Sequence, residues 1–471
     1  FIDAPFTFSV ITAPLYQLMG YRGLYIVPLV SLWVVWGRLW HLCRVWQVRS
    51  ILTAMSLALV MLASPLTLYG AMYWEHTLAV ALAFWGLSGL LLHSLPEGTT
   101  TRISLNQAMI NGVCIGLSTW LRSEFFCLVL VLAILMVLSL VPRKHLHKRL
   151  HVRVPNGLSK LLILTSLGAM GTTVVALFAI NTVIYGHPLG VKALEVKTAV
   201  SLGQRLWEIR SNYFHLAISL LRYFPAVLLS LGLPWLMQGQ ARKTAMEMVL
   251  VGGLFTLLVP LVAPLAMATE QWGPRFYLIL VPLVGLLLAA ALRNLWWMKT
   301  TRRNLLAAIA FMIVVGCQTN LVNGGLRDYY DPLTNSASLS SQYTPAAPAI
   351  TALGNFDERW VAMAHQAVAQ QLWPSVRFKI FFRVETDPTV EQLVEAMVEQ
   401  DESSFLYICD AQQPCPIPEQ EKLQFKLPDT NISVNFSSLG VFGDYLFYRG
   451  VVKTSAINRS AFSSPQSLNG R

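Results

Sequence analysis

Long apolar runs alternate with short polar segments over the first two thirds of the chain. Each run is close to the ~20 residues that a helix needs to cross ~30 Å of hydrocarbon. Because lipid offers no water to backbone N–H and C=O groups, each run is predicted to be helical. The pattern predicts about ten transmembrane helices, at residues 22–40, 51–69, 76–93, 107–121, 124–142, 161–184, 213–237, 247–267, 276–294 and 304–320.

The amino-terminal residues 1–21 have a different pattern. Pro5, Pro14 and Gly20 interrupt a mixed stretch, which predicts an amphipathic entry segment at the membrane interface ahead of a transmembrane domain at 22–320. The chain starts at Phe1 without a basic region or a cleavage site. We therefore expect a further segment to precede it.

From residue 321 the pattern becomes that of a soluble domain. It predicts a small α/β domain at 321–453, followed by a disordered Ser/Asn-rich tail at 454–471. Within the domain, helices are predicted at 357–372 and 388–400, and strands at 376–382, 405–409, 422–427, 431–436 and 444–449.

Composition agrees with a membrane protein. The chain is 55% hydrophobic and only 13% charged, unlike a soluble domain. The chain has a net charge of +11, but its basic residues do not form a basic domain. Nucleic-acid binding is therefore excluded.

The basic residues gather in short loops that alternate along the chain. By the positive-inside rule these loops are cytoplasmic, which places the entry segment, the 185–212 loop and the carboxy-terminal domain on the extracytoplasmic side. Mixed helical spacing after a turn at Tyr185–Gly190 predicts a helix resting on that outer surface. The basic residues are Arg38, Arg44, Arg49, Arg143, Lys144, Lys148, Arg149, Arg153, Lys160, Arg242, Lys243, Lys299, Arg302 and Arg303.

Three short polar clusters stand at the predicted outer ends of apolar runs: Tyr73–Thr77, Arg122–Glu124 and Trp272–Arg275. Charged groups at a membrane boundary are costly unless they face protein, water or a ligand. We therefore expect the three clusters to form one site on the outer side.

Arginine and carboxylate side chains at headgroup depth suit group transfer from a lipid phosphate. Guanidinium groups pair bidentately with phosphate oxygens, and a carboxylate can take a proton from an attacking hydroxyl. Each residue alone also fits a simpler role: Arg222 can snorkel to the interface, and Trp272 can belong to an interfacial aromatic belt. The predicted catalytic residues are Glu75 and Asp3, and the predicted substrate-binding residues are Trp74, His76, Arg122, Glu124, Arg222, Trp272 and Arg275.

Cysteine and metal patterns add little. Cys409 and Cys415 lie close in sequence, and an oxidising compartment would let them form a disulfide. No Asp/His group has convincing metal-ligand spacing, so no metal site is predicted and a need for a divalent cation stays open.

The order and sidedness of these motifs resemble the GT-C superfamily of integral-membrane glycosyltransferases, in particular bacterial relatives of the protein O-mannosyltransferases and the lipid A aminoarabinose transferase. The resemblance covers residues 1–320 and rests on Pro5–Gly20, Tyr73–Thr77, Leu121–Glu124, Tyr185–Pro188 and Trp272–Phe276. It implies hexosyl or pentosyl transfer from a polyprenyl-phosphate donor to a glycan, lipid or protein acceptor. It also implies a bacterial inner membrane and transfer on the extracytoplasmic face.

The chain departs from the superfamily pattern at its start. Members carry an essential acid in the first outer loop, after a first transmembrane helix. This chain begins inside that loop with Asp3 as its only acid there, so a first helix is expected before residue 1, and either Asp3 or Glu75 is the candidate acid.

Two other functions fit a polytopic chain. A lipid or solute transporter or flippase is the main alternative, although charges at one rim and the lack of an internal repeat favour a transferase. An assembly protein anchored by its membrane part is the other.

Overall fold

The computed structural model describes residues 6–91, 104–140, 160–190, 202–263, 274–295, 298–327 and 346–456, with short gaps at 365–367, 369–371, 373–374, 376–377, 385–386, 412–414, 416–421 and 428–429. The chain divides into two compact units, Phe1–Leu326 and Arg327–Arg471. Each unit is described by itself.

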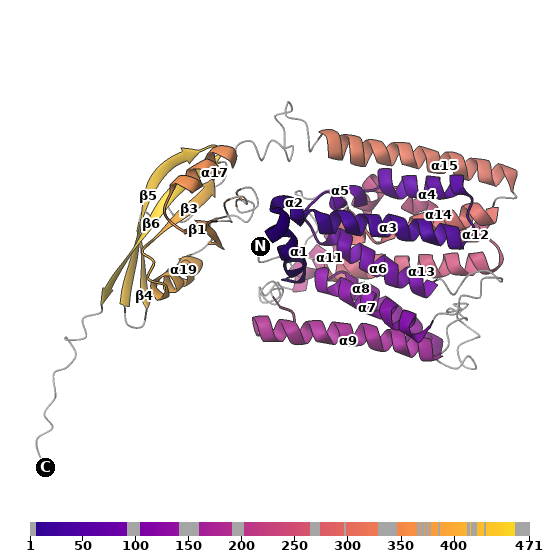
Figure 1. Ribbon diagram of the computed structural model, residues 1–471, viewed down its shortest axis with the longest axis horizontal. Coiled ribbons are helices and arrows are strands. Elements are labelled where there is room, and N and C mark those ends of the chain that lie inside the picture. Colours follow the sequence, from indigo (N-terminus) through magenta and orange to yellow (C-terminus); the bar gives the residue numbers. More distant parts are fainter. Residues whose placement is uncertain are drawn as a thin grey trace, which may run out of the picture. The chain divides into compact units, whose positions relative to one another are not determined.

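The first unit is helical, and its longer helices lie side by side (Figure 1). Every apolar run predicted to span the membrane overlaps at least one helix. The described elements are α1 (Phe6–Met19), α2 (Tyr21–Leu24), α3 (Ile26–Val45), α4 (Ser50–Leu62), α5 (Leu66–Gly70), α6 (His76–Leu91), α7 (Leu105–Leu121), α8 (Phe125–Leu140), α9 (Lys160–Tyr185), α11 (Leu202–Tyr223), α12 (Val227–Leu236), α13 (Gly239–Val262), the 3₁₀ turn η2 (Arg275–Tyr277), α14 (Leu280–Asn294), α15 (Lys299–Cys317) and the π-helical η4 (Gln318–Arg327).

Helix length separates these elements into two groups. In the described part of the chain, four helices are long and apolar enough to cross a membrane, or five if the bent pair α11–α12 counts as one span. Helices α4, α6, α8 and α14 are apolar but shorter. The first unit is thus an integral membrane domain, while the total of ten crossings stays a prediction.

Two of the predicted spans are broken. The run at 51–69 divides into α4 and α5 at Ala63–Pro65. The run at 213–237 divides into α11 and α12, whose axes differ by 81°. Pro225 explains the second break, since proline has no N–H and excludes the helical conformation at the residue before it. The backbone N–H of Val227 bonds instead to Phe224, at 3.2 Å.

A side-chain contact places one of the basic segments away from the polar clusters. Arg38 on α3 donates from Nε to Ser88 on α6 at 2.9 Å and lies over the Trp85 ring at 4.6 Å. Ser88 is about 18 Å along α6 from His76, at 1.5 Å per residue. Arg38 therefore lies toward the far end of the bundle from His76, as the alternation of loops predicts, and its cytoplasmic location stays a prediction.

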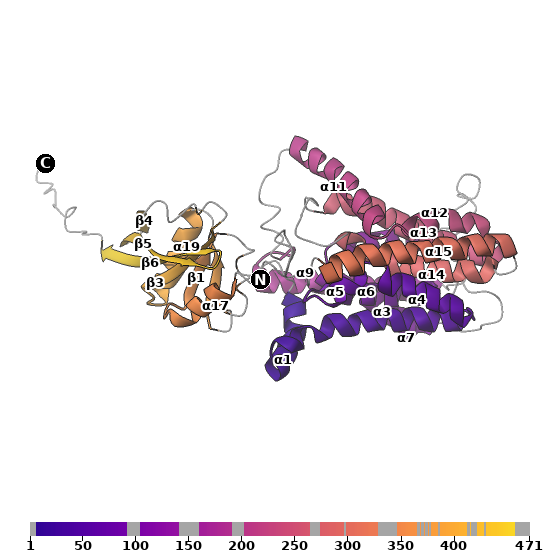
Figure 2. The same ribbon diagram turned by 90° about the horizontal axis from the view of Figure 1, so that it is seen from above.

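The second unit is a mixed six-stranded sheet of order β2-β1-β3-β6-β5-β4, in which β1 pairs in parallel with β2 and β3 and the remaining pairs are antiparallel. Helices α17 and α19 lie on opposite sides of the sheet (Figure 2). The elements are α17 (Ala346–Asn355), β1 (Trp360–Met363), β2 (Ile380–Arg383), α19 (Asp387–Glu399), β3 (Ser404–Asp410), β4 (Lys422–Leu427), β5 (Thr430–Phe442) and β6 (Tyr445–Ala456).

Alternating residues of β1 explain why each face of the sheet is covered by a helix. Trp360 and Ala362 belong to the core that contains Val390 of α19, whereas Val361 and Met363 belong to the core that contains Leu353 of α17. Successive side chains of a strand point to opposite faces, so each face has its own helix and its own core.

The predicted helix at 357–372 is wrong at Trp360–Met363, which form β1. All four residues are buried, because the strand is covered on both faces, and such strands lack the alternation of polar and apolar residues that marks a half-exposed strand. The second predicted helix is confirmed as α19, and the strands at 405–409 and 422–427 are confirmed as β3 and β4. The predicted tail at 454–471 lies mostly outside the described residues.

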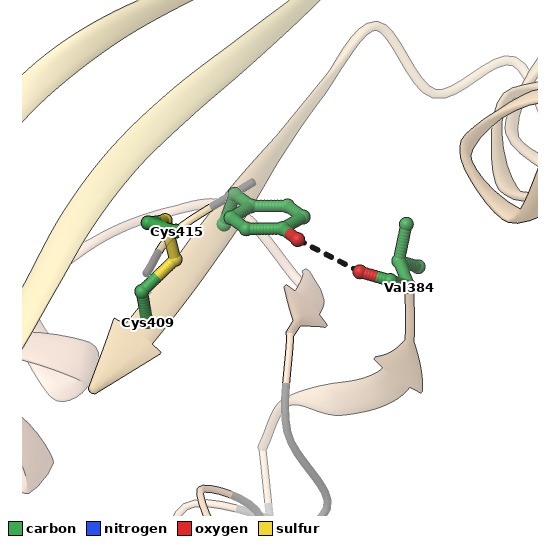
Figure 3. The surroundings of a disulfide bond; sticks show 4 residues. Val384, Cys409 and Cys415 are labelled. Atoms are coloured by element: carbon green, nitrogen blue, oxygen red, sulfur yellow. Dashed lines mark hydrogen bonds between the residues drawn. A yellow bond between two sulfur atoms is a disulfide. The ribbon is translucent and has the colours of Figure 1, made fainter. Parts of the chain in front are cut away.

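The predicted disulfide between Cys409 and Cys415 is confirmed, with the Cα atoms 5.7 Å apart. It lies at the end of β3, near a buried hydrogen bond from the Tyr407 hydroxyl to the Val384 carbonyl at 2.7 Å (Figure 3).

Candidate functional site

Residues of the three polar clusters meet at one end of the first unit. Glu75 precedes α6, and Arg122 is the residue that ends α7. Nη1 of Arg122 donates to Oε1 of Glu75 at 3.1 Å. The guanidinium groups of Arg122 and Arg275 both approach the Phe276 ring, at 5.6 and 4.6 Å from its centroid. Segments far apart in sequence thus form one group, which we call the charged cluster: Glu75, Arg122, Glu124 and Arg275.

Arg122 is held by two carboxylates. Besides its bond to Glu75, it donates from Nε to both oxygens of Glu124, at 2.9 and 3.2 Å. Glu75 and Glu124 are only 8% and 4% exposed. Burial by itself would lower the pKa of Arg122, but the two carboxylates outweigh it and raise that pKa above its usual value. Arg122 therefore stays charged, and its donors are directed at protein carboxylates.

Arg275 differs from Arg122. Among the described residues it forms no ion pair, and its guanidinium lies over the Phe276 ring. Burial and the repulsion of Arg122 both lower the pKa of Arg275 from its usual value. Arginine nevertheless remains protonated in proteins. Arg275 is thus the cation of the cluster that forms no ion pair with a described carboxylate.

An aromatic group adjoins the cluster. The rings of Tyr69, Trp74 and His76 lie 4.8, 5.2 and 5.6 Å from one another, so they form a triangle. Both nitrogens of His76 are buried without a hydrogen-bond partner among the described residues, and Nδ1 is 3.9 Å from Oε1 of Glu75. A buried polar group without a partner is rare and often marks a binding or catalytic site.

Of the remaining predicted residues, only Arg222 is described, and no contact joins it to this group. Arg222 is exposed in the last turn of α11, with its guanidinium 5.4 Å from the neighbouring Tyr223 ring. Asp3 and Trp272 lie outside the described residues. Tyr69 was not predicted, because a tyrosine at the end of an apolar run looks like a core residue. The nearby Ser64-Pro65 pair, which interrupts that run, was the available signal.

An apolar groove of about 410 Å³ lies between α11, α12, α13 and α14. Several lining residues, including Leu228 at 51% and Leu231 at 61%, are exposed, so the groove is open to its surroundings. Its lining comprises Tyr213, Ala217, Leu220, Leu221, Val227, Leu228, Ser230, Leu231, Met248, Val249, Gly252, Gly253, Thr256, Leu257, Tyr277, Leu280, Leu283, Val284 and Leu287.

Tyr277 links the groove to the charged cluster. It lines the groove and belongs to the same 3₁₀ turn as Arg275. Its hydroxyl donates to the Thr256 carbonyl at 3.0 Å. That carbonyl lacks its usual helical donor, because residue 260 is a proline inside α13. The turn that carries Arg275 is therefore fixed to the groove wall.

Within the described residues, no group of three His, Cys, Asp or Glu side chains is placed to hold a metal ion. The need for a divalent cation stays open.

Comparison with known proteins shows which solved structures share this fold. No protein-family model and no curated protein matches the chain. Among solved structures, ArnT from Cupriavidus metallidurans bound to undecaprenyl phosphate has a TM-score of 0.56 at 11% identity, over 95% of this chain and 88% of that chain. The chain has the fold of this ArnT structure.

Two further solved structures match the chain. The apo state of the same ArnT gives a TM-score of 0.55 over the same shares of both chains. The oligosaccharyltransferase of Archaeoglobus fulgidus gives 0.43 at 10% identity, over 86% of this chain and 61% of that one, which is too slight to carry an argument. The ArnT-like fold agrees with the resemblance that the sequence motifs indicated, and at this identity the likeness concerns the fold alone.

Proposed function

We propose that this GT-C protein is a glycosyltransferase that moves a sugar from a polyprenyl-phosphate donor to an acceptor. The observation that carries the proposal is the juxtaposition of Arg275 and the apolar groove. A half-buried cation that forms no ion pair with a described carboxylate and an apolar groove, joined through Tyr277, fit the two halves of an isoprenoid phosphate. The similar ArnT structure with bound undecaprenyl phosphate supports the same class of donor.

The reaction transfers one glycosyl group. An acceptor hydroxyl oxygen attacks the anomeric carbon, and the bond from that carbon to the phosphate oxygen breaks, leaving the electron pair on the phosphate. The hydroxyl proton passes to a carboxylate. Arg275 stabilises the phosphate as its charge grows.

Glu75 is our candidate for the proton acceptor. Its Oε1 accepts from Arg122, and among the described residues no hydrogen bond is made to Oε2. Glu124 and Arg122 then position Glu75 rather than bind substrate directly. Asp3 is a second candidate for the base.

The other predicted residues have binding roles in this proposal. Trp74 and His76 form the aromatic wall against which a sugar ring would pack, with the imidazole nitrogens free to pair with its hydroxyls. Trp272 and Arg222 are assigned to the donor side.

The predicted sidedness places transfer on the extracytoplasmic face of a bacterial inner membrane. A hexose or pentose is the proposed sugar, and the proposed acceptor is a glycan, a lipid or a protein.

The test follows labelled sugar from polyprenyl-phosphate donors into a membrane extract. We expect transfer by the native chain and its loss in Glu75→Gln and Arg275→Ala. Arg275→Lys should recover only part of the activity, since an ammonium cannot pair bidentately with phosphate. Arg44→Ala, which removes an exposed arginine from the predicted cytoplasmic side, is the charge-matched control and should transfer normally.

Absence of transfer over a broad donor panel would contradict the proposal. Movement of lipid across vesicle membranes in the same preparation would instead support the transporter or flippase.

A further inference from the structure

Asn320 connects two breaks in the helical backbone of the first unit to the end of α15. It lies in η4, directly after α15, and is fully buried. Its Nδ2 donates to the carbonyls of Tyr223 at 2.8 Å, Gly316 at 3.0 Å and Ala63 at 3.4 Å. Carbonyls at a helix end have no helical donor, and burying them unpaired is costly.

Two of these carbonyls belong to functionally placed segments. Tyr223 ends α11 at the 81° bend, and groove residues lie on both sides of it: Leu220 and Leu221 before the bend, Val227 and Leu228 after it.

Ala63 ends α4 just before α5, the helix that carries Tyr69 of the aromatic triangle. One amide therefore joins the bend of the groove to the segment that leads into the site.

The packing around Asn320 leaves it little freedom. A Cβ atom built on Gly316 would come within 2.4 Å of the Ala63 carbonyl oxygen, so α15 and α4 are in direct backbone contact there. The two helices run side by side in both views (Figures 1 and 2). Asn320 thus occupies a fixed position between the α4 end and the α11 end. Its segment is π-helical, a geometry often found at functional sites.

We propose that Asn320 is a positioning residue that sets the bend between α11 and α12, and thereby the groove's affinity for a long isoprenoid chain. The inference rests on the proposed function for the identity of the groove's ligand. Asn320 does not itself touch substrate in this proposal. It acts through the Tyr223 carbonyl.

The experiment compares Asn320→Leu, which keeps the branching at Cγ but removes both N–H donors, with Asn304→Ala, which removes an exposed amide from α15. The probes are undecaprenyl phosphate and the short-chain citronellyl phosphate, whose equilibrium binding to purified protein is measured. We expect Asn320→Leu to weaken undecaprenyl phosphate binding about fivefold or more, the effect of losing ~1 kcal/mol. Citronellyl phosphate binding should change much less, because a short chain fills little of the groove.

A second readout does not depend on lipid. Backbone amide exchange at Phe224 and Val227 should be faster in Asn320→Leu than in Asn304→Ala, since the carbonyl that anchors the bend has lost its donor. Unchanged exchange, or equal losses for both lipids, would overturn the positioning role. The native chain could bind neither phosphate while amide exchange is still faster in Asn320→Leu. That result would overturn the proposed donor but would support the role of Asn320 in setting the bend.

If Asn320→Leu is not recovered as monodisperse protein, Asn320→Ser carries the same comparison. It retains one hydroxyl donor in less space, and we expect it to bind undecaprenyl phosphate more weakly than the native chain.

Discussion

Glu75 and Arg122 are 47 positions apart in sequence, yet Oε1 of the one accepts a hydrogen bond from Nη1 of the other at 3.1 Å. Their side chains are 11% and 17% exposed, so solvent screens the pair only partly. The contact fixes the start of α6 against the end of α7. Substitutions at either residue are therefore expected to change stability, by amounts that depend on which partners remain.

Removing Arg122 should destabilise the protein more than removing Glu75. Arg122→Gln leaves the buried carboxylates of Glu75 and Glu124 without the cation that is hydrogen-bonded to both, at a cost of about 3–5 kcal/mol. Glu75→Gln leaves Arg122 still paired with Glu124 and should cost less. Thermal unfolding in detergent measures both, and Arg122→Gln combined with Glu124→Gln should be more stable than Arg122→Gln alone. Arg205→Gln, at a more exposed pair with Glu208, is the control and should cost about 1 kcal/mol at most. Equal stability of Arg122→Gln and the control would refute this ordering.

Gly316 should not tolerate a larger side chain. Its added Cβ would approach the Ala63 carbonyl oxygen at 2.4 Å and the Ala63 Cβ at 2.6 Å, and backbone cannot give way as a flexible side chain can. We expect Gly316→Ala to lower the free energy of unfolding by about 1–3 kcal/mol through overpacking. Gly168→Ala on α9, where a Cβ meets nothing within 4 Å, should be neutral or stabilising by roughly 0.5–1 kcal/mol. If Gly168→Ala also lowers the free energy of unfolding, the loss in Gly316→Ala cannot be attributed to the contact with Ala63.

Loss of the Cys409–Cys415 disulfide should weaken the second unit modestly. The two cysteines are six positions apart, and a loop this short restricts the unfolded chain by only about 2 kcal/mol. Replacing both by serine should speed amide exchange in β3 and β6, with no change in α6 or α7. Cys317→Ser, which removes a free thiol from the first unit, is the control.

Tyr445 should make the stability of the second unit depend on alkaline pH. Burial, followed by the nearby carboxylates of Asp410 and Asp444, raises the pKa of Tyr445 above its usual value near 10. The folded state therefore holds the phenol proton more tightly than the unfolded state. The stability this gives is complete below the unfolded pKa and declines as pH rises through about 10 and beyond.

Thermal unfolding of the native chain and of Tyr445→Phe between pH 8 and pH 11 measures this effect, as the difference between the two proteins. We expect the phenylalanine variant to lose less stability over the range. A difference that is constant with pH would rule out the titration of Tyr445 as the cause.

The amino-acid sequence predicts the helices well because each is an apolar run of suitable length. It predicts less about how they end: neither the 81° bend at Pro225 nor the break at Ala63–Pro65 shows in the hydropathy pattern. Strand β1 was missed because burial on both faces removes the period that identifies a strand. Spacing and sidedness predict which polar clusters reach the same end of the bundle.

Spacing along the chain does not predict how helices are rotated about their axes. It therefore could not show that Arg122 faces two carboxylates while Arg275 faces none among the described residues. Asn320 was missed for a related reason. A single amide at the end of an apolar run gives no sign that two carbonyls distant in sequence converge on it.

The two arginines and two glutamates of the charged cluster sum to electroneutrality. A neutral group of charges can stay assembled beside hydrocarbon without a counter-ion. Under the proposed function, a bound phosphate would make the local charge negative, and its departure would restore neutrality. The same charge balance would then favour release of a phosphate product after sugar transfer.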